Sequence, residues 1–265
     1  MSHDLGSVKR PLFPSNSVEL IPVQDSSQAC AHLAVELHGS LRESAQEQRS
    51  LVLGLATGRT MVGLYRELVR LLQAEPVDLS HLTTFNLDEY LDLSVDDPRS
   101  FQHFMTEHLF GPLGLEPGSC HFPDAQAAVQ DPVGAGAAYT AMIQEAGGLD
   151  MQLLGLGRNG HIAFNEPGSP ADSLTRVVDL HPMTREDAAG EFGGMDHVPK
   201  RAMTMGLGEI RAARRLRLLA FGEHKSAPLA AALGSESGIE RPLSCLMQHP
   251  DLVIWADGAA RGQVD

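Results

Sequence analysis

Two short polar segments, each directly after a strand-like run, hold the residues best suited to proton transfer. Asp88 and Glu89 follow the run 82–85, and His161 follows a glycine-rich turn after the run 150–154. A carboxylate in such a place can act as a general base, and an imidazole with an acid nearby can carry a proton near neutral pH. Because neighbouring residues of an extended chain point to opposite sides, we expect only one of the two acids to be the base, with solvated surface charges as the alternative.

The segment 155–167 reads Gly-Leu-Gly-Arg-Asn-Gly-His-Ile-Ala-Phe-Asn-Glu-Pro. Three glycines in its first six residues indicate positive φ angles or a close approach of the backbone to another group. Asn159 and Glu166 are near His161 in sequence and can orient its ring, and a purely structural histidine is the alternative. The segment is not a dinucleotide fingerprint, because its proline interrupts the long helix that such a motif requires.

A second turn, 56–60, has the features of an anion site. It lies between the apolar run 51–55 and a helical pattern over 61–72, so its backbone N–H groups lie at a helix N-terminus, where a phosphate is stabilised. The residues that would contact the anion are Thr57, Gly58, Arg59 and Thr60. The turn lacks the P-loop pattern, and a plain N-capping turn is the alternative.

Apolar periodicity along the chain alternates between strand-like and helix-like segments. The expected helices are 25–48, with Asp25 and Ser26 as candidate N-cap residues, 61–72, 100–109 and about 224–233. The expected strands are 51–55, 82–85, 150–154, 201–205, 216–221 and 252–255. This order predicts an α/β fold with a single doubly wound, mainly parallel, Rossmann-like sheet that helices cover on both faces. Ligands of such sheets bind beyond the carboxyl ends of the strands, so we expect the polar segments to meet there.

Length and composition restrict the class of protein. The 265 residues suit one domain over 17–265, after a flexible leader over 1–16. With 34 acidic and 20 basic residues the formal net charge is -14, which disfavours a nucleic-acid partner or an anionic membrane surface. The N-terminus does not resemble a signal peptide and no apolar run is long enough to cross a membrane, so we expect a cytoplasmic location. The cysteines Cys30, Cys120 and Cys245 are far apart, which argues against a disulfide framework or a zinc site.

Three literal motifs resemble those of the glucosamine-6-phosphate deaminase family and occur in the family's order. They are Phe85-Asn86-Leu87-Asp88-Glu89-Tyr90, the segment 155–167, and Val198-Pro199-Lys200 with Ala202-Met203-Thr204-Met205-Gly206. The resemblance extends from about residue 51 to about residue 255, most of the chain. The related 6-phosphogluconolactonases share the fold but differ after the second strand and after Gly-His, so the motifs favour the deaminase branch.

The resemblance implies an aldose–ketose isomerisation with deamination, which converts glucosamine 6-phosphate to fructose 6-phosphate and ammonia. It implies that Asp88 is the base that moves the C2 proton to C1, and that His161 with Glu166 carries the proton that opens the sugar ring. Asn159 takes a position held by Asp or Asn in the family, and it can orient the imidazole but cannot titrate. No metal and no organic cofactor is implied, because the amine and hydroxyls of the substrate supply the reactive groups.

For the phosphate, the resemblance points to Thr57, Gly58, Thr60 and Lys225. An arginine of the family falls on Gly190 in this chain, while Arg59 occupies a turn position where Gly or Ser is usual. We hypothesise that Arg59 supplies the missing guanidinium, whose planar fork suits bidentate contact with a phosphate. An Arg59 that points to solvent is an equal alternative.

Allosteric members of the family bind N-acetylglucosamine 6-phosphate through basic and hydroxyl residues soon after the catalytic motif. Arg176 is retained in this stretch, but Val178 and Asp179 stand where a basic residue and a hydroxyl are expected. The resemblance therefore implies weak or no activation of this kind.

Three alternatives to the deaminase function remain open. They are a 6-phosphogluconolactonase, an isomerase for a related amino sugar such as galactosamine 6-phosphate, and a noncatalytic sugar-phosphate sensor. The retention of Asp88, His161 and Glu166, together with the acidic charge and the lack of a helix-turn-helix segment, argues against the sensor. The expected partner is a small amino-sugar phosphate, and both a monomer and a homo-oligomer are compatible with these patterns.

Overall fold

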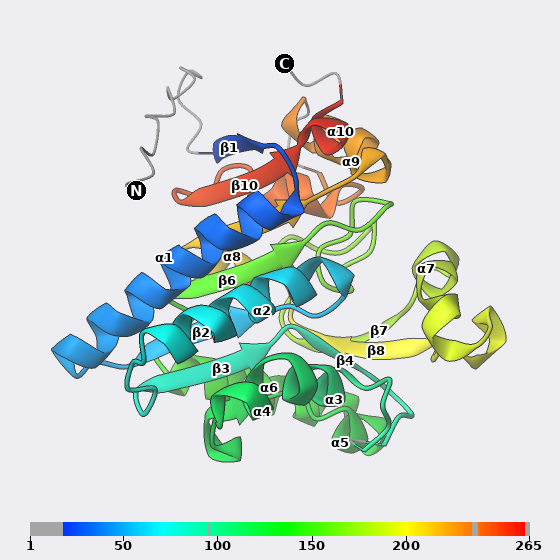
Figure 1. The fold of residues 1–265 in the computed structure, drawn as a ribbon. Coiled ribbons are helices and arrows are strands. Elements are labelled where there is room, and N and C mark those ends of the chain that lie inside the picture. The colour runs from blue at the N-terminus through cyan, green and yellow to red at the C-terminus, as the bar shows by residue number, and fades with distance from the viewer. Residues whose placement is uncertain (1–17, 95, 235–237, 263–265) are drawn as a thin grey trace.

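The computed structural model describes residues 18–94, 96–234 and 238–262 (Figure 1), so the expected leader over 1–16 lies outside the described residues. The strands are β1 (Val18–Val23), β2 (Leu51–Leu55), β3 (Leu82–Asn86), β4 (Asp88–Tyr90), β5 (Cys120–His121), β6 (Met151–Gly155), β7 (Arg176–Asp179), β8 (Arg201–Thr204), β9 (Leu216–Ala220) and β10 (Leu252–Asp257). The α-helices are α1 (Ser26–Glu47), α2 (Arg59–Ala74), α3 (Phe101–Met105), α4 (Gly111–Leu113), α5 (Ala125–Gln130), α6 (Pro132–Glu145), α7 (Pro182–Phe192), α8 (Leu207–Ala212), α9 (Ser226–Leu233) and α10 (Gly258–Arg261). A π-helical turn covers Thr106–Phe110, and 3-10 turns cover Pro117–Ser119, Met195–His197, Glu223–Lys225 and Pro242–Leu246.

The main sheet has seven strands in the order β1-β10-β9-β6-β2-β3-β5, and its neighbouring strands are parallel. This confirms the expected mainly parallel α/β fold. After β2 the chain adds β3 and β5 on one side, and then returns through β6 to the other side of β2. The topology therefore switches direction between β2 and β6, which is where open α/β sheets bind their ligands.

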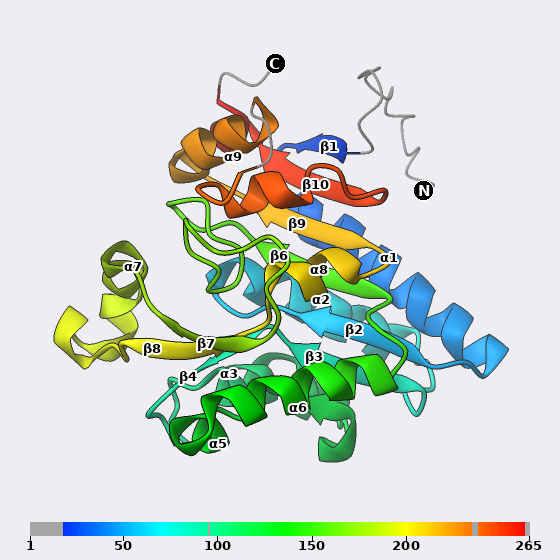
Figure 2. The same cartoon turned by 180° about the vertical axis from the view of Figure 1, so that it is seen from behind.

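Helices cover both faces of the main sheet. α1 and α2 lie on the face seen in Figure 1, and α6 and α8 lie on the opposite face, seen in Figure 2. Every residue of β2 is buried, as are the first five residues of β10. Double coverage explains why these strands read as continuous apolar runs in the sequence and not as alternating ones.

The first helix follows the sequence pattern closely. The Asp25 side chain accepts the backbone N–H of Gln28 at 3.0 Å, so Asp25 is the N-cap of α1. Leu33 and Leu37 are fully buried in the core, as the helical period predicts. α2 packs against α1 and begins at Arg59, two residues earlier than predicted, so the turn after β2 is shorter than expected.

A second, smaller sheet is built from β4, β8 and β7 in antiparallel pairs. The strand predicted at 201–205 is present at Arg201–Thr204, but it belongs to this sheet and not to the main one. An apolar run indicates that a strand is buried, and carries no information about its pairing partner. In Figure 1, β7 and β8 extend away from the main sheet and carry α7 at their outer end. The side chains that form a small separate core in this region are Tyr90, Phe164, Leu180, Phe192, Val198 and Ala202.

Two predicted helices are only partly α-helical. Ser100 caps α3 by accepting the N–H of His103 at 3.0 Å, and the chain then passes through the π-helical turn before α4 begins. The helix predicted at about 224–233 opens with a 3-10 turn and becomes α-helical at Ser226. Within the described ranges, none of the helices combines the length and the apolar character that crossing a membrane requires.

Candidate active site

A pocket of about 590 Å³ lies beyond the carboxyl ends of β2 and β6, at the switch point of the main sheet. The turn after β2, the residues after β3 and the glycine-rich segment after β6 form its walls, so the three polar segments do meet. The predicted residues that line the pocket are Thr57, Gly58, Arg59, Thr60, Asp88, His161 and Lys225. The remaining two, Asn159 and Glu166, contact each other and surround the His161 ring.

Asp88 and Glu89 project to different sides of β4. Asp88 lines the pocket and is only 6% exposed. The Glu89 carboxylate instead accepts the backbone N–H groups of Phe101 and Gln102 at 3.1 and 3.0 Å, and so caps α3. Burial, and to a smaller extent the neighbouring Glu89, raises the pKa of Asp88 well above its ordinary value. Of the two acids, Asp88 is the one placed to meet a ligand in this pocket.

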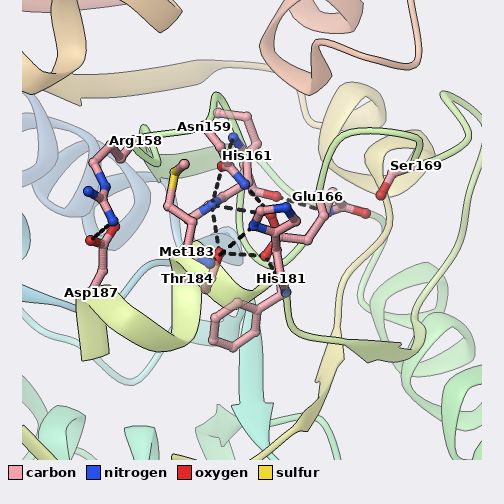
Figure 3. A network of polar contacts seen from close by, with 12 residues as sticks. Arg158, Asn159, His161, Glu166, Ser169, His181, Met183, Thr184 and Asp187 are labelled. Carbon is pink, nitrogen blue, oxygen red and sulfur yellow. Dashed lines mark hydrogen bonds and ion pairs between the residues drawn. The ribbon is translucent and has the colours of Figure 1, made fainter. Parts of the chain in front are cut away.

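Asn159 holds His161 through two contacts (Figure 3). Its Oδ1 lies 3.1 Å from the backbone nitrogen of His161 and 2.7 Å from Nδ1 of the ring. Because an amide oxygen can only accept a hydrogen bond, this contact favours the tautomer with a proton on Nδ1. The other ring nitrogen, Nε2, is then the one that can take a proton from a ligand.

The glycine-rich segment is shaped around the His161 ring. A Cβ atom at Gly157 would lie 2.3 Å from Cε1 and Nδ1 of His161, so only glycine lets the imidazole fold back over the turn. Ala163, which also lines the pocket, has a φ of 52°. This left-handed backbone costs an L-residue about 1–2 kcal/mol, and such strain is concentrated at functional sites.

Glu166 completes the group around the imidazole. Its Oε2 accepts a hydrogen bond from Asn159 Nδ2 at 2.7 Å and lies 3.6 Å from His161 Nδ1. Its Oε1 accepts a hydrogen bond from Thr184 Oγ1 at 2.5 Å. Burial opposes the charge of this carboxylate, but its contact with His161 and the hydrogen bonds that it accepts lower the pKa of Glu166 to about 2. Glu166 is therefore an anion at neutral pH, next to a ring that can carry a proton.

The turn after β2 forms a separate, cationic part of the pocket. Gly58 is the N-cap of α2 and has a φ of 96°, a region that favours glycine. Arg59 is exposed, while Lys225 is half-buried, and burial lowers the pKa of Lys225. Gly190, the position where an arginine was expected, is exposed on α7, and the pocket-lining residues do not include it. A helix N-terminus and two cations thus surround the same space.

α7 supplies a wall of the pocket that the sequence pattern did not predict. Thr184, Asp187 and Glu191 line the pocket from this helix. Only Thr184 and Phe192 are buried on α7, so the helix has no apolar stripe from which a helical period could be read. One signal was available, because Pro182 occupies the first helical position, where proline is favoured.

Arg176 has partners inside the chain. Its guanidinium donates to Asn165 Oδ1 at 2.9 Å and to Ser169 Oγ at 3.2 Å, and burial lowers its pKa. Asn165 is fully buried, and its amide donates to the backbone oxygens of Ile162 and Met205. Arg176 therefore helps to hold Asn165 in place, the residue next to Glu166 in the glycine-rich segment.

The pocket combines a buried carboxylate and an oriented imidazole with a helix N-terminus and two cationic side chains. Within the described part of the chain, no cluster of three or more His, Cys, Asp or Glu side chains is arranged to hold a metal ion. The side chains that are present can transfer protons and bind a phosphorylated ligand. Fold and site thus define an α/β protein with a polar crevice at the switch point of a parallel sheet.

The chain belongs to the family of glucosamine-6-phosphate isomerases/6-phosphogluconolactonase, whose model matches residues 24–255. It is 41% identical to the glucosamine-6-phosphate deaminase of Rhodopirellula baltica, over 94% of this chain and 97% of the relative. It is 40% identical to that of Shewanella loihica, over 93% of this chain and 90% of the relative. These similarities confirm the resemblance inferred from the motifs.

Solved structures give the same placement. A monomeric glucosamine-6-phosphate deaminase matches with a TM-score of 0.85 and 35% identity, over 91% of this chain and 98% of that one. The 6-phosphogluconolactonase of Thermotoga maritima matches with a TM-score of 0.70 at 19% identity, over 91% and 99% of the two chains, which shows a shared fold.

Proposed function

We propose that the chain is a glucosamine-6-phosphate deaminase, which converts glucosamine 6-phosphate and water to fructose 6-phosphate and ammonia. One observation carries the proposal: the buried carboxylate of Asp88 and the oriented imidazole of His161 line the same pocket as the anion-binding turn. A phosphorylated aldose needs both groups, an acid–base pair for its reacting carbons and cations for its phosphate. Identities of 41% and 40% to proteins named as deaminases support this function.

Ring opening is the first proposed step. His161 Nε2 accepts the proton of the anomeric hydroxyl and delivers it to the ring oxygen, so the bond between C1 and the ring oxygen breaks and an aldehyde forms. Asn159 keeps the ring in the required tautomer, and the anionic Glu166 stabilises the imidazolium that is formed transiently. A positioned acid–base group of this kind contributes roughly 10²–10⁴ in rate.

Isomerisation and deamination follow at C1 and C2. Asp88 removes the C2 proton while a proton passes from the substrate nitrogen to the C1 oxygen, which gives an enolamine. The same carboxyl then returns the C2 proton to C1, which leaves an imine at C2. Water adds to the imine at C2 and ammonia leaves, so the ketone of fructose 6-phosphate forms. The pKa of Asp88, raised by burial, makes it a stronger base than an ordinary aspartate, and the cationic amine of a bound substrate favours its ionised form.

The substrate phosphate is proposed to bind at the turn of Thr57, Gly58 and Thr60, with Lys225 and Arg59 as its cations. The N-terminus of α2 and both cations line the pocket, which supports this assignment. A protein with a formal net charge of -14 repels a phosphate at long range, so local cations are needed to hold it. In this proposal Arg59 takes the place of the arginine that is absent at Gly190.

The proposal also covers the setting of the reaction. We propose that residues 17–265 form one domain, that the protein is located in the cytoplasm, and that the reaction uses neither a metal nor an organic cofactor. The proposal includes weak or no activation by N-acetylglucosamine 6-phosphate, because Val178 and Asp179 offer no cation or hydroxyl to an effector. The internal contacts of Arg176 with Asn165 and Ser169 support this part of the proposal.

Product analysis on a panel of substrates tests the function. We expect ammonia and fructose 6-phosphate in equal amounts from glucosamine 6-phosphate, and little ammonia from unphosphorylated glucosamine. Hydrolysis of 6-phosphogluconolactone without ammonia release would replace the deaminase by a lactonase. Preferential turnover of galactosamine 6-phosphate would assign the other epimer, and binding without any turnover would indicate a sensor.

A further inference from the structure

The hydroxyl of Thr184 is the contact between α7 and the acid–base group. Thr184 is only 6% exposed, and its Oγ1 lies 2.5 Å from Glu166 Oε1 and 3.3 Å from His161 Nδ1 (Figure 3). The other members of the group, His161, Asn159 and Glu166 itself, come from the segment after β6. β7, β8 and α7 form an outer arm of the molecule, and among its described residues Thr184 is the one whose side chain bonds to this group.

The single proton of this hydroxyl has one possible use. An ionised carboxylate only accepts hydrogen bonds, so Thr184 donates to Glu166 and keeps its own lone pairs for the Nδ1–H of His161. Both hydrogen-bond partners of Nδ1, the Asn159 oxygen at 2.7 Å and the Thr184 oxygen at 3.3 Å, are then acceptors. This arrangement fixes the proton of the neutral imidazole on Nδ1. It also lets Thr184 donate a hydrogen bond to the ionised form of Glu166.

Other contacts between α7 and the glycine-rich segment are weaker or less direct. Arg158 pairs with Glu186 at 2.8 Å and with Asp187 at 2.9 Å, but these side chains are 38–67% exposed, and exposed pairs contribute little. The backbone N–H of His181 donates to Glu166 Oε1 at 3.3 Å. The titratable and charged side chains of the two elements that pack here are Arg158, His161, Glu166, His181, Arg185, Glu186, Asp187 and Glu191.

We infer that Thr184 is a positioning residue whose hydroxyl keeps Glu166 ionised and directed at His161, so that proton transfer at the imidazole depends on how α7 is seated. This inference rests on the proposed function, in which His161 and Glu166 open the sugar ring. It explains why a threonine is buried on a helix that otherwise buries only Phe192. It also makes α7 part of the acid–base chemistry and not only a wall of the pocket.

Matched variants test the inference by kcat, KM and the pH dependence of kcat with glucosamine 6-phosphate. Thr184→Val replaces the hydroxyl by a methyl group at similar volume, and Thr184→Ser keeps the hydroxyl. Thr140→Val is the control, because Thr140 is also buried on a helix and donates to the Glu209 carboxylate at 2.6 Å, away from the pocket. Thr184→Ala provides the same comparison if the valine variant does not fold.

We expect Thr184→Val to lower kcat about tenfold with little change in KM, because a hydrogen bond to a charged group is lost. The acid limb of its pH profile should move to higher pH, since the ionised Glu166 has lost a donor. Thr184→Ser should retain most of the activity, and Thr140→Val should lower the melting temperature but keep the parent pH profile.

Two outcomes would overturn the inference: a parent-like kcat and profile in both Thr184→Val and Thr184→Ala, or an equal loss in Thr184→Ser. The variant His161→Gln separates this from a failure of the proposed function. A strong loss in His161→Gln with an unaffected Thr184→Val rejects the role of Thr184 alone. An unaffected His161→Gln rejects the ring-opening role on which the inference rests.

Discussion

The acid–base part of the pocket is prearranged, whereas its anion part is open. Asp88 is 6% exposed and Glu166 accepts hydrogen bonds on both oxygens, but Arg59 is exposed and Lys225 only half-buried. Proton transfer requires reacting atoms in nearly fixed positions, while cations on long side chains can adjust to a phosphate as it binds. Changes in the first part should therefore lower kcat, and changes in the second should raise KM.

The variant Asp88→Asn should have the largest effect. It removes the base and leaves the phosphate contacts, so kcat should fall by roughly 10²–10⁴ with a nearly unchanged KM. Steady-state kinetics with glucosamine 6-phosphate measure both quantities. Glu89→Gln is the neighbouring control: it weakens the cap of α3, so it should lower thermal stability much more than kcat. An unchanged kcat in Asp88→Asn would remove Asp88 from the reaction.

Replacing His161 should affect one form of the substrate. His161→Gln should slow the closed-ring sugar by roughly 10²-fold, but should slow far less a 5-O-methylated analogue that cannot close the six-membered ring. The measurement is C2 proton exchange into heavy water for both compounds. The control His224→Gln changes an exposed histidine at the same pocket and should slow neither compound. Equal losses on the two compounds would place His161 outside ring opening.

Replacing the cationic residues beside the turn after β2 should raise KM. Losing a charge-assisted hydrogen bond costs about 1.5–3 kcal/mol, so Lys225→Ala should raise KM by roughly ten- to a hundredfold, with a smaller change in kcat. Arg59→Ser should raise KM by about tenfold, because Arg59 is more exposed to solvent. Arg70→Ser is the matched control on α2, where Arg70 pairs with Glu67 on the surface. If Arg59→Ser keeps the parent KM and the preference for phosphorylated sugar, Arg59 is a surface residue.

Asn159→Asp should have the smallest effect on activity. The added negative charge beside His161 stabilises the imidazolium, and Glu166 loses the hydrogen bond that Asn159 Nδ2 donates, so both changes favour protonation of the group. The variant should stay active, with its pH–rate profile moved to higher pH. A well-folded but inactive protein would show that this site requires a neutral side chain at position 159.

The sequence predicts the position of the acid–base residues in more detail than it predicts the rest of the fold. The strands before Asp88 and before the segment 155–167 are short, almost entirely buried and followed by polar residues, a pattern typical of central parallel strands. Since such strands end at one edge of a sheet, the sequence alone indicates that these residues meet. The direction of Asp88 and Glu89 also follows from strand alternation.

The outer arm could not be predicted in this way. β7 has no fully buried residue and α7 has only Thr184 and Phe192, so neither shows a period that the core would impose. α6 could not be predicted for the opposite reason. Its Ala- and Gly-rich sequence is apolar around much of the helix, so it shows no distinct apolar face. The sequence pattern therefore identifies neither Thr184 nor the helix that carries it, although the contact of Thr184 with Glu166 is among the shortest in the site.

The position of β1 at the edge of the main sheet has a consequence for how the chain is made. β1 pairs with β10 alone, in a register that joins Val18 to Leu252 and Pro22 to Ala256. An edge strand tolerates Pro22, which lacks an N–H. During synthesis β1 leaves the ribosome more than two hundred residues before its partner. β1 must therefore stay unpaired until β10 has been synthesised, and a truncation that removes β10 also detaches β1.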